Sequence, residues 1–184
     1  MKRPLVFALM LISLCGASTA ARAASSLIIV NTSSGTPVAC APAGVTLGAL
    51  PACAANTGFS AYSLSLGFSN GGMTPSVTNV SILKAIDGTS AGFTMGMIQG
   101  TSIGNVLISV YSSEDITAAG TGTPAASYTL QLTDVFVTSV SDSGFPVQAV
   151  TLACGTIVYR FNHHDSGTPT VYKTTYNALT NTVS

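Results

Sequence analysis

Apolar residues recur at every second position along several stretches of the chain, which is the pattern of β-strands with one buried face. The segment YSLSLGFS, residues 62–69, alternates in this way and places on one face Tyr62, Leu64, Leu66 and Phe68. The longer segment SYTLQLTDVFVTSVS, residues 127–141, aligns on one face Tyr128, Leu130, Leu132, Phe136 and Val140, interrupted by Asp134. Both segments are predicted to be half-buried strands.

A third strand is predicted over residues 147–161, and its alternation changes parity partway. Val150, Leu152 and Cys154 share one side, whereas the apolar residues from 157 onward need the opposite numbering. Gly155 lies where the parity changes, which indicates a bulge or bend in the strand. Further strands are expected at residues 27–30, 79–84, 105–112 and 170–176, separated by segments rich in Gly, Pro, Ser and Asn. Seven such strands predict a mainly β fold, either a sandwich or a barrel.

One short helix is expected between these strands. Thr89 or Ser90 can cap its start with a hydroxyl group, Phe93, Met97 and Ile98 have helical spacing, and Gly100 ends it. Two glycines inside this segment each cost up to about 1 kcal/mol relative to alanine. The helix therefore needs packing against the sheet to be stable.

The first 23 residues have the pattern of a cleavable export signal. Two basic residues precede an apolar run of about ten residues, and Ala21-Arg22-Ala23 supplies small residues at the positions that a signal peptidase reads. A bilayer span needs roughly 20 apolar residues, so a membrane anchor is the weaker alternative. Lipid attachment at Cys15 is a second alternative, although Leu14 stands where a small residue is expected. We therefore expect a periplasmic or extracellular protein with no membrane association after cleavage.

Residues 24–58 lack a regular period and are expected to form an irregular N-terminal segment ahead of a domain at 59–184. Cys40 and Cys53 flank an irregular run there, and an oxidising compartment favours a disulfide between them. The alternative is that both are free thiols. Cys154 lies within a predicted strand and is expected to be a small buried apolar residue.

Charge is scarce: 7% of the residues are charged. Without the export signal, Lys84, Arg160 and Lys173 stand against six acidic residues, a net charge of −3. Three cations cannot form a phosphate-binding patch, so nucleic-acid binding is not expected. Solubility then depends on Ser, Thr and Asn, as in secreted β proteins or in subunits that bury much of their surface in an assembly.

The sequence offers little catalytic or metal-binding chemistry. His163, His164 and Asp165 form one polar cluster, but neighbouring residues on an extended chain point to opposite faces, and the following Ser-Gly indicates a turn. Glu114 and Asp115 are neighbours in a predicted loop and are interpreted as solubilising charges. We expect no catalytic residue, no metal and no cofactor, and hence no enzyme; a secreted hydrolase remains a formal alternative.

Three segments in this order resemble the Hcp family, the haemolysin-coregulated tube proteins of bacterial type VI secretion. Lys84, Asp87 and Ser90 match a Lys-x-x-Asp-x-x-Ser motif that leads into a short helix, a Gly and a strand. Residues 128–139 match a Tyr-x-Leu-x-Leu strand with a Val-x-Ser ending, and residues 150–161 match a Val-x-Leu strand that continues to aromatic residues. The resemblance covers roughly residues 62–176.

The resemblance implies a compact β-barrel flanked by one helix, six copies of which close into a ring, with rings stacking into a tube that carries effectors. It also implies a structural role for Lys84 and Asp87 at the corner between strand and helix; a simple surface ion pair is the alternative. The partners expected are further copies of the chain, in a ring of up to six, and secreted effectors or secretion-machinery proteins. The loop at 112–127 is expected to be apolar, exposed and used for ring closure. The alternative from another class is an exported β-sandwich adhesin or pilin-like surface subunit.

Overall fold

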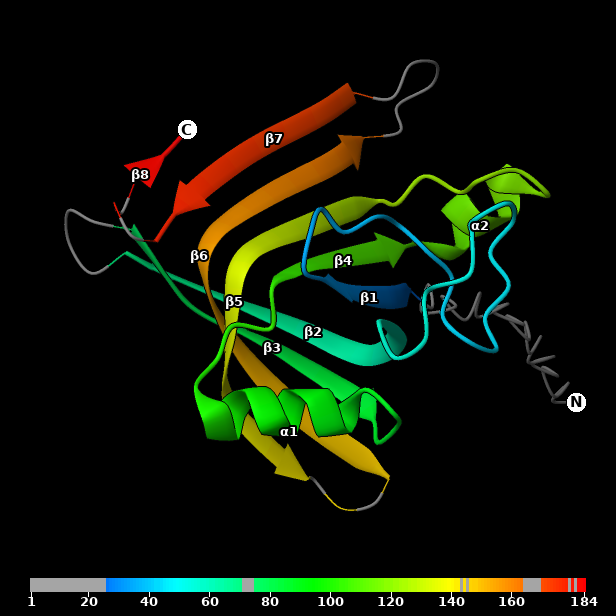
Figure 1. Cartoon of the computed structure of the whole chain (residues 1–184). Coiled ribbons are helices and arrows are strands. Elements are labelled where there is room, and N and C mark those ends of the chain that lie inside the picture. Colours follow the sequence, from blue (N-terminus) through cyan, green and yellow to red (C-terminus); the bar gives the residue numbers. More distant parts are fainter. Residues whose placement is uncertain are drawn as a thin grey trace, which may run out of the picture.

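The computed structural model describes residues 26–70, 75–142, 144, 146–163, 170–178, 180 and 182–184 (Figure 1). The export signal predicted at residues 1–23 lies outside the described residues. The described part contains β1 (Leu27–Ser33), β2 (Gly58–Asn70), β3 (Pro75–Ala85), α1 (Ser90–Gln99), β4 (Asn105–Tyr111), α2 (Ser113–Ala119), β5 (Tyr128–Asp142), β6 (Val147–His163), β7 (Thr170–Asn177) and β8 (Thr182–Val183).

Six of these strands close into an antiparallel barrel in the order β1-β4-β5-β6-β3-β2. The closing pair is β3 with β6, in register from Val80 opposite Leu152 to Ala85 opposite Val147. This confirms the prediction of a mainly β barrel with a flanking helix, and the sandwich alternative is wrong because one continuous ladder surrounds the core. The barrel begins at Leu27, since β1 lies between β2 and β4, and not at residue 59, where the sequence placed its start.

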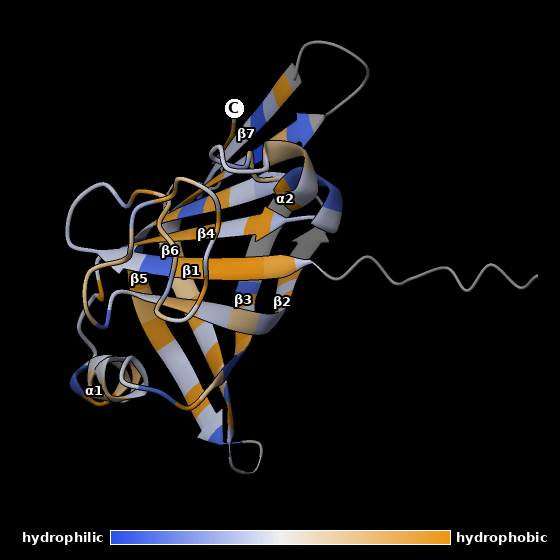
Figure 2. Ribbon diagram, turned by 90° about the vertical axis from the view of Figure 1, so that its right-hand side faces the viewer, coloured by the Kyte–Doolittle hydropathy of each residue, from blue (hydrophilic) through white to orange (hydrophobic). Residues whose placement is uncertain are grey.

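β1 is hydrophobic along most of its length because it is buried on both faces (Figure 2). Ile28 and Val30 point into the barrel core, whereas Ile29 belongs to a second apolar cluster on the outside. That second cluster contains Ile29, Ala41, Leu47, Tyr111 and Ala126. Ala41 and Leu47 come from the irregular segment between β1 and β2, so this segment covers the outer face of β1 and β4 and is not a free excursion.

The predicted inward position of Tyr62 is wrong, and a β-bulge explains the error. Ala61 pairs with Lys84 while Ser63 pairs with Leu83, so Tyr62 is an extra residue in β2. The bulge inverts the alternation: Phe59 and Ala61 are buried before it, Leu64 and Leu66 pack on the core after it, and Tyr62 is 63% exposed.

The predicted inward position of Phe136 is also wrong, because the backbone of Asp134 adopts a positive φ of 54°. The alternation of β5 inverts there, so Val135 and Val137 enter the core and Phe136 faces outward. Gly155 of β6 lies directly across from this point, and a Cβ at Gly155 would contact the Asp134 side chain at 3.5 Å. The parity change predicted at Gly155 is confirmed, since Leu152 and Ile157 are both buried. The two strands therefore bend together.

The bend coincides with a change of partner along β6. Its first half, up to Leu152, pairs with β3, and its second half, from Thr156, pairs with β7. β7 in turn pairs with β8 only at Tyr176 and Asn177. The second half of β6 with β7 and β8, which we call the arm (residues 156–163, 170–177 and 182–183), extends beyond the point where β3 and β6 pair, as the upper strands in Figure 1.

The predicted helix is α1, and Gly100 ends it in a left-handed conformation with φ of 61°. Phe93 is buried and Met97 packs on the core, but Ile98 is 69% exposed, so its predicted inward position is wrong. Gly96 is buried in the place expected for Ile98. A Cβ at Gly96 would lie only 2.8 Å from the Ile103 side chain, so the close packing of the helix favours glycine there. The helix lies along β5 below the barrel in Figure 1.

The expected loop at residues 112–127 contains a second helix, α2, which the sequence analysis missed. Ser112 and Asp115 form a capping box: each side chain accepts a hydrogen bond from the other residue's backbone N–H. Ile116 packs partly against the second apolar cluster. Asp115 is therefore a helix-capping group in addition to a surface charge, which corrects its interpretation as a purely solubilising residue.

Candidate functional site

Lys84 is the fully buried centre of a polar cluster between β3 and α1. Its ammonium group donates to the Asp87 carboxylate at 2.9 Å, the Ser90 hydroxyl at 2.8 Å and the Ala85 carbonyl at 2.7 Å. It also lies 5.0 Å from the centre of the Phe59 ring. All three donors of the ammonium are thus satisfied, as a buried charge requires. The structure brings together the three residues of the Lys-x-x-Asp-x-x-Ser motif, and we call them with Phe59 and Thr89 the Lys84 corner.

Asp87 completes this corner from the more exposed side, with its side chain 39% exposed. Its carboxylate accepts from the Thr89 N–H at 2.8 Å and from the Thr89 hydroxyl. Partial burial alone would raise the pKa of Asp87, but the hydrogen bonds from Thr89 and Lys84, with the charge of Lys84, lower it below its ordinary value of 3.8. Asp87 is therefore ionised throughout the neutral range.

The two hydroxyl groups that were expected to cap α1 form hydrogen bonds within the Lys84 corner. Thr89 is the N-cap residue, yet its side chain makes no capping hydrogen bond to the helix and donates to Asp87 instead. The Ser90 hydroxyl accepts from Lys84 and from the Asp87 N–H at 3.1 Å. The cluster thereby fixes the path of the chain from β3 into α1. Because these polar groups form hydrogen bonds with one another, the arrangement suits a structural role in the turn between β3 and α1.

Cys40 and Cys53 form the disulfide that their positions predict. The bridge staples the segment that covers β1, and Cys53 also donates its N–H to the Ala41 carbonyl. Cys154 is a free cysteine that packs partly against the barrel core, and burial raises its pKa to about 11. At neutral pH its thiol is protonated and a poor nucleophile.

The polar cluster predicted at residues 163–165 falls largely outside the described residues: β6 ends at His163, and His164 and Asp165 are not described. Among the residues that are described, no group of three His, Cys, Asp or Glu side chains is placed to hold a metal ion. Neither of the two described helices has the length and apolarity that crossing a bilayer requires.

The arm carries exposed apolar side chains beside an open strand edge. Val171 is 56% exposed, Tyr172 is 60% exposed, and Phe161 and Val183 are also exposed. Within the described residues, no strand pairs with the outer edge of β7 from Thr170 to Thr174. Open edges and clustered exposed apolar residues are features of surfaces that pair with another chain. This surface, and not the polar corner, is the part of the molecule best suited to contact a partner.

Comparison with known folds agrees with this architecture. The structure is similar to Hcp1 from Salmonella typhimurium, with a TM-score of 0.63 at 15% identity over 86% of this chain and 98% of that one. It is also similar to a type VI secretion system effector from Yersinia pestis, with a TM-score of 0.58 at 17% identity over 82% and 98% of the two chains. A third similar structure is the secreted protein Hcp3 from Pseudomonas aeruginosa, with a TM-score of 0.52 at 17% identity over 80% and 98%.

Comparison by sequence gives the family. No curated protein sequence matches the chain. The model of the family described as "Type VI secretion system effector, Hcp" matches residues 56–161, which include β2 to β5, α1, the Lys84 corner and most of β6. Because that match spans more than half of the chain and the fold agrees with it, the protein belongs to the Hcp family of type VI secretion proteins.

Proposed function

We propose that the protein is an exported, ring-forming subunit of a type VI secretion system, which works through contacts with copies of itself and with effector or secretion-machinery proteins. The family match over residues 56–161 carries this proposal, because it covers five of the six barrel strands together with α1. Rings of six copies are what the family resemblance implies for a subunit of this shape. The sparsely charged, Ser- and Thr-rich composition suits a chain that buries much of its surface in an assembly.

Export is the second element of the proposal. The first 23 residues have the charge, length and cleavage pattern of an export signal. The Cys40–Cys53 disulfide supports it, because such bridges form and persist in oxidising compartments. N-terminal sequencing of the protein recovered from the periplasm or medium of its host should begin at Ala24. Recovery of an intact Met1 terminus in the cytoplasm would contradict export.

The arm supplies the contact surface in this proposal. A neighbouring subunit that pairs with the outer edge of β7 would cover Val171 and Tyr172 and would satisfy backbone groups that otherwise face water. The contact is head to tail, since the arm is an appendage on one side of the barrel and its partner surface lies elsewhere on the next copy. The loop at residues 112–127 was the first expectation for this contact. It contains the capped helix α2, and it packs on the second apolar cluster through Ile116 and Ala126.

Size measurement tests the ring directly. The protein purified under oxidising conditions should have the mass of about six protomers by native mass spectrometry or light scattering at micromolar concentration. A strict monomer at high micromolar concentration would contradict ring formation while leaving the fold unaffected.

A matched pair of substitutions tests the surface. Tyr172→Asp places a charge on the arm and should shift the assembly to monomers. Tyr62→Asp changes a tyrosine of nearly equal exposure on the β2 bulge and should leave the mass unchanged. An unchanged mass for Tyr172→Asp would exclude the arm as the contact surface.

A further inference from the structure

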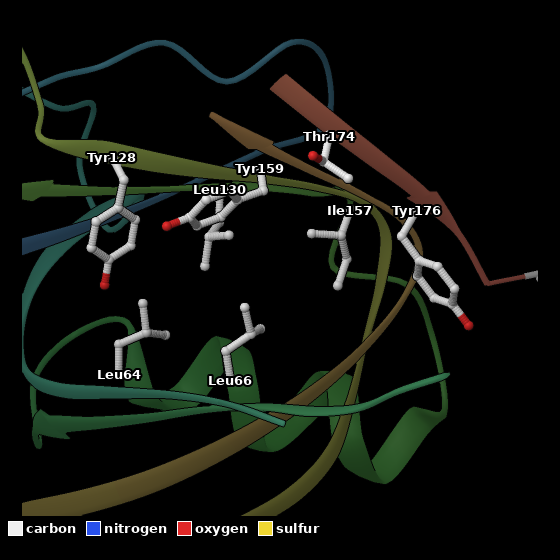
Figure 3. Close-up of a pocket in the computed structure, with 8 residues that line it drawn as sticks. All are labelled: Leu64, Leu66, Tyr128, Leu130, Ile157, Tyr159, Thr174 and Tyr176. Carbon is white, nitrogen blue, oxygen red and sulfur yellow. The ribbon is translucent and has the colours of Figure 1, made fainter. Parts of the chain in front are cut away.

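A cleft opens into the barrel where β6 exchanges β3 for β7 as its partner. Its volume is about 440 Å³, within the range of roughly 300 to 1,000 Å³ that small-molecule pockets occupy. Leu64 and Leu66 rise from β2 on one side, and residues of β5, β6 and β7 face them from the other (Figure 3). The lining residues are Leu64, Leu66, Tyr128, Leu130, Ile157, Tyr159, Thr174 and Tyr176.

The walls of this cleft are neutral and mostly apolar. None of the eight lining residues carries a charge at neutral pH, and Leu130 and Ile157 form a dry floor. Tyr128 and Tyr159 pack with their ring centres 5.7 Å apart. Burial, with a smaller contribution from Tyr159, raises the pKa of Tyr128, so its hydroxyl remains a neutral donor. A charged ligand would lose its hydration here without an opposite charge to replace it.

The backbone of the β5 and β6 wall is already used, because Leu130 pairs with Ile108 and Tyr159, and Tyr159 pairs with Thr174 on its other side. A polypeptide lying along this wall would bury its own N–H and C=O groups without backbone partners there, which costs free energy for each group. A small molecule with few polar groups does not carry this cost.

We propose that this cleft is a binding site for a neutral, predominantly apolar small molecule, such as one with an aromatic ring system or an aliphatic chain and a single hydrogen-bonding group. The leucine and isoleucine side chains contact the apolar body, and a lining hydroxyl, such as that of Tyr128 or Tyr159, bonds its polar end. The site adjoins the assembly surface at Thr174, which lines it, whereas Tyr172, two residues away on the same face of β7, does not.

The test uses N-phenyl-1-naphthylamine, a neutral apolar dye whose fluorescence rises in dry environments, with the purified, folded protein. Saturable binding of one dye per chain is expected. Thr174→Trp fills the cleft from an exposed position and should weaken binding at least tenfold. Lys173→Trp places the same ring on the opposite face of β7 and should bind as the unmodified protein does.

A second pair probes the other wall. Leu64→Trp should weaken binding at least tenfold, whereas Ser65→Trp, next to it on the opposite face of β2, should not. Circular dichroism shows which variants are folded, and either folded pair is sufficient. The Tyr172→Asp variant should still bind one dye per chain, because Tyr172 does not line the cleft, and this distinguishes loss of the ring from loss of the cleft. Absence of saturable binding, or equal affinities within a folded pair, would overturn the proposal.

Discussion

The two ends of the barrel differ in how the sheet is completed. At the Lys84 corner, β3 and β6 pair in continuous register and a buried cation joins the strand to α1. At the other end β3 leaves β6, the arm takes its place, and apolar side chains and a strand edge remain exposed. The same strand, β6, takes part in both ends, and the bend at Asp134 and Gly155 separates them. Under the proposed function, the closed end holds the barrel together and the open end supplies the surface that contacts other molecules.

Core truncation should show the largest contrast between the two ends. Ile82→Ala removes a side chain that is 1% exposed within the β3–β6 pair and should lower the free energy of unfolding by about 2–5 kcal/mol. Val171→Ala, on the exposed arm, should change it by no more than about 0.5 kcal/mol. Urea unfolding measures both. Similar losses for the two variants would mean that the arm is part of the cooperative core.

Removal of the disulfide should have the next largest effect. The bridge spans 13 residues, and a loop of this size contributes on the order of 3 kcal/mol through the unfolded chain. The double variant Cys40→Ser, Cys53→Ser should lose about that amount in urea unfolding. Loss of the cover over β1 should also speed hydrogen exchange around Ile29. Cys154→Ser serves as the control for a cysteine that makes no bridge.

Removing each of the two charges of the Lys84 corner should change the free energy of unfolding by a different amount. Asp87→Ala leaves a buried ammonium with neutral partners only, and we expect a loss of about 2 kcal/mol, less than for a fully buried pair because Asp87 is partly exposed. Lys84→Met removes the buried charge itself and fills the same space, so it should cost less than Asp87→Ala. The reverse order in urea unfolding would show that the ion pair is not what fixes the corner.

The smallest expected effect at the Lys84 corner is the loss of stability when acid protonates Asp87. The pKa of Asp87 is lowered in the folded state, so its contribution to stability is complete above its ordinary value of 3.8 and is lost as the pH falls through the folded value. The free energy of unfolding should therefore fall more steeply between pH 6 and pH 3 for the unmodified protein than for Asp87→Asn. Parallel curves would contradict the shift.

Much of the closed end could be predicted from the sequence, because its signals are local. The alternation of apolar residues, Gly100 at the end of α1 and the pairing of Cys40 with Cys53 each depend on residues close together in the chain. Tyr62 and Phe136 were placed wrongly because a bulge and a positive φ invert the alternation, and neither leaves a periodic signal. The helix α2 had a signal in Ser112-x-x-Asp115 that could have been used.

The open end was harder to predict, because it depends on strand order. Nothing local in β6 shows that its first half pairs with β3 and its second half with β7. Gly155 indicated a bend but not a change of partner. The cleft follows from that change and from residues of four strands, so no single segment predicts it.

The central claim is that a rigid barrel carries an arm whose edge is completed by a neighbouring subunit. Hydrogen exchange, followed residue by residue in the assembled protein and in Tyr172→Asp, tests it most directly. The amides of Val80–Ala85 and Val147–Leu152 should exchange equally slowly in both, while those on the outer edge of β7 should be protected only in the assembly. Equal exchange at the β7 edge in the two proteins, or fast exchange along the β3–β6 pair, would contradict the account.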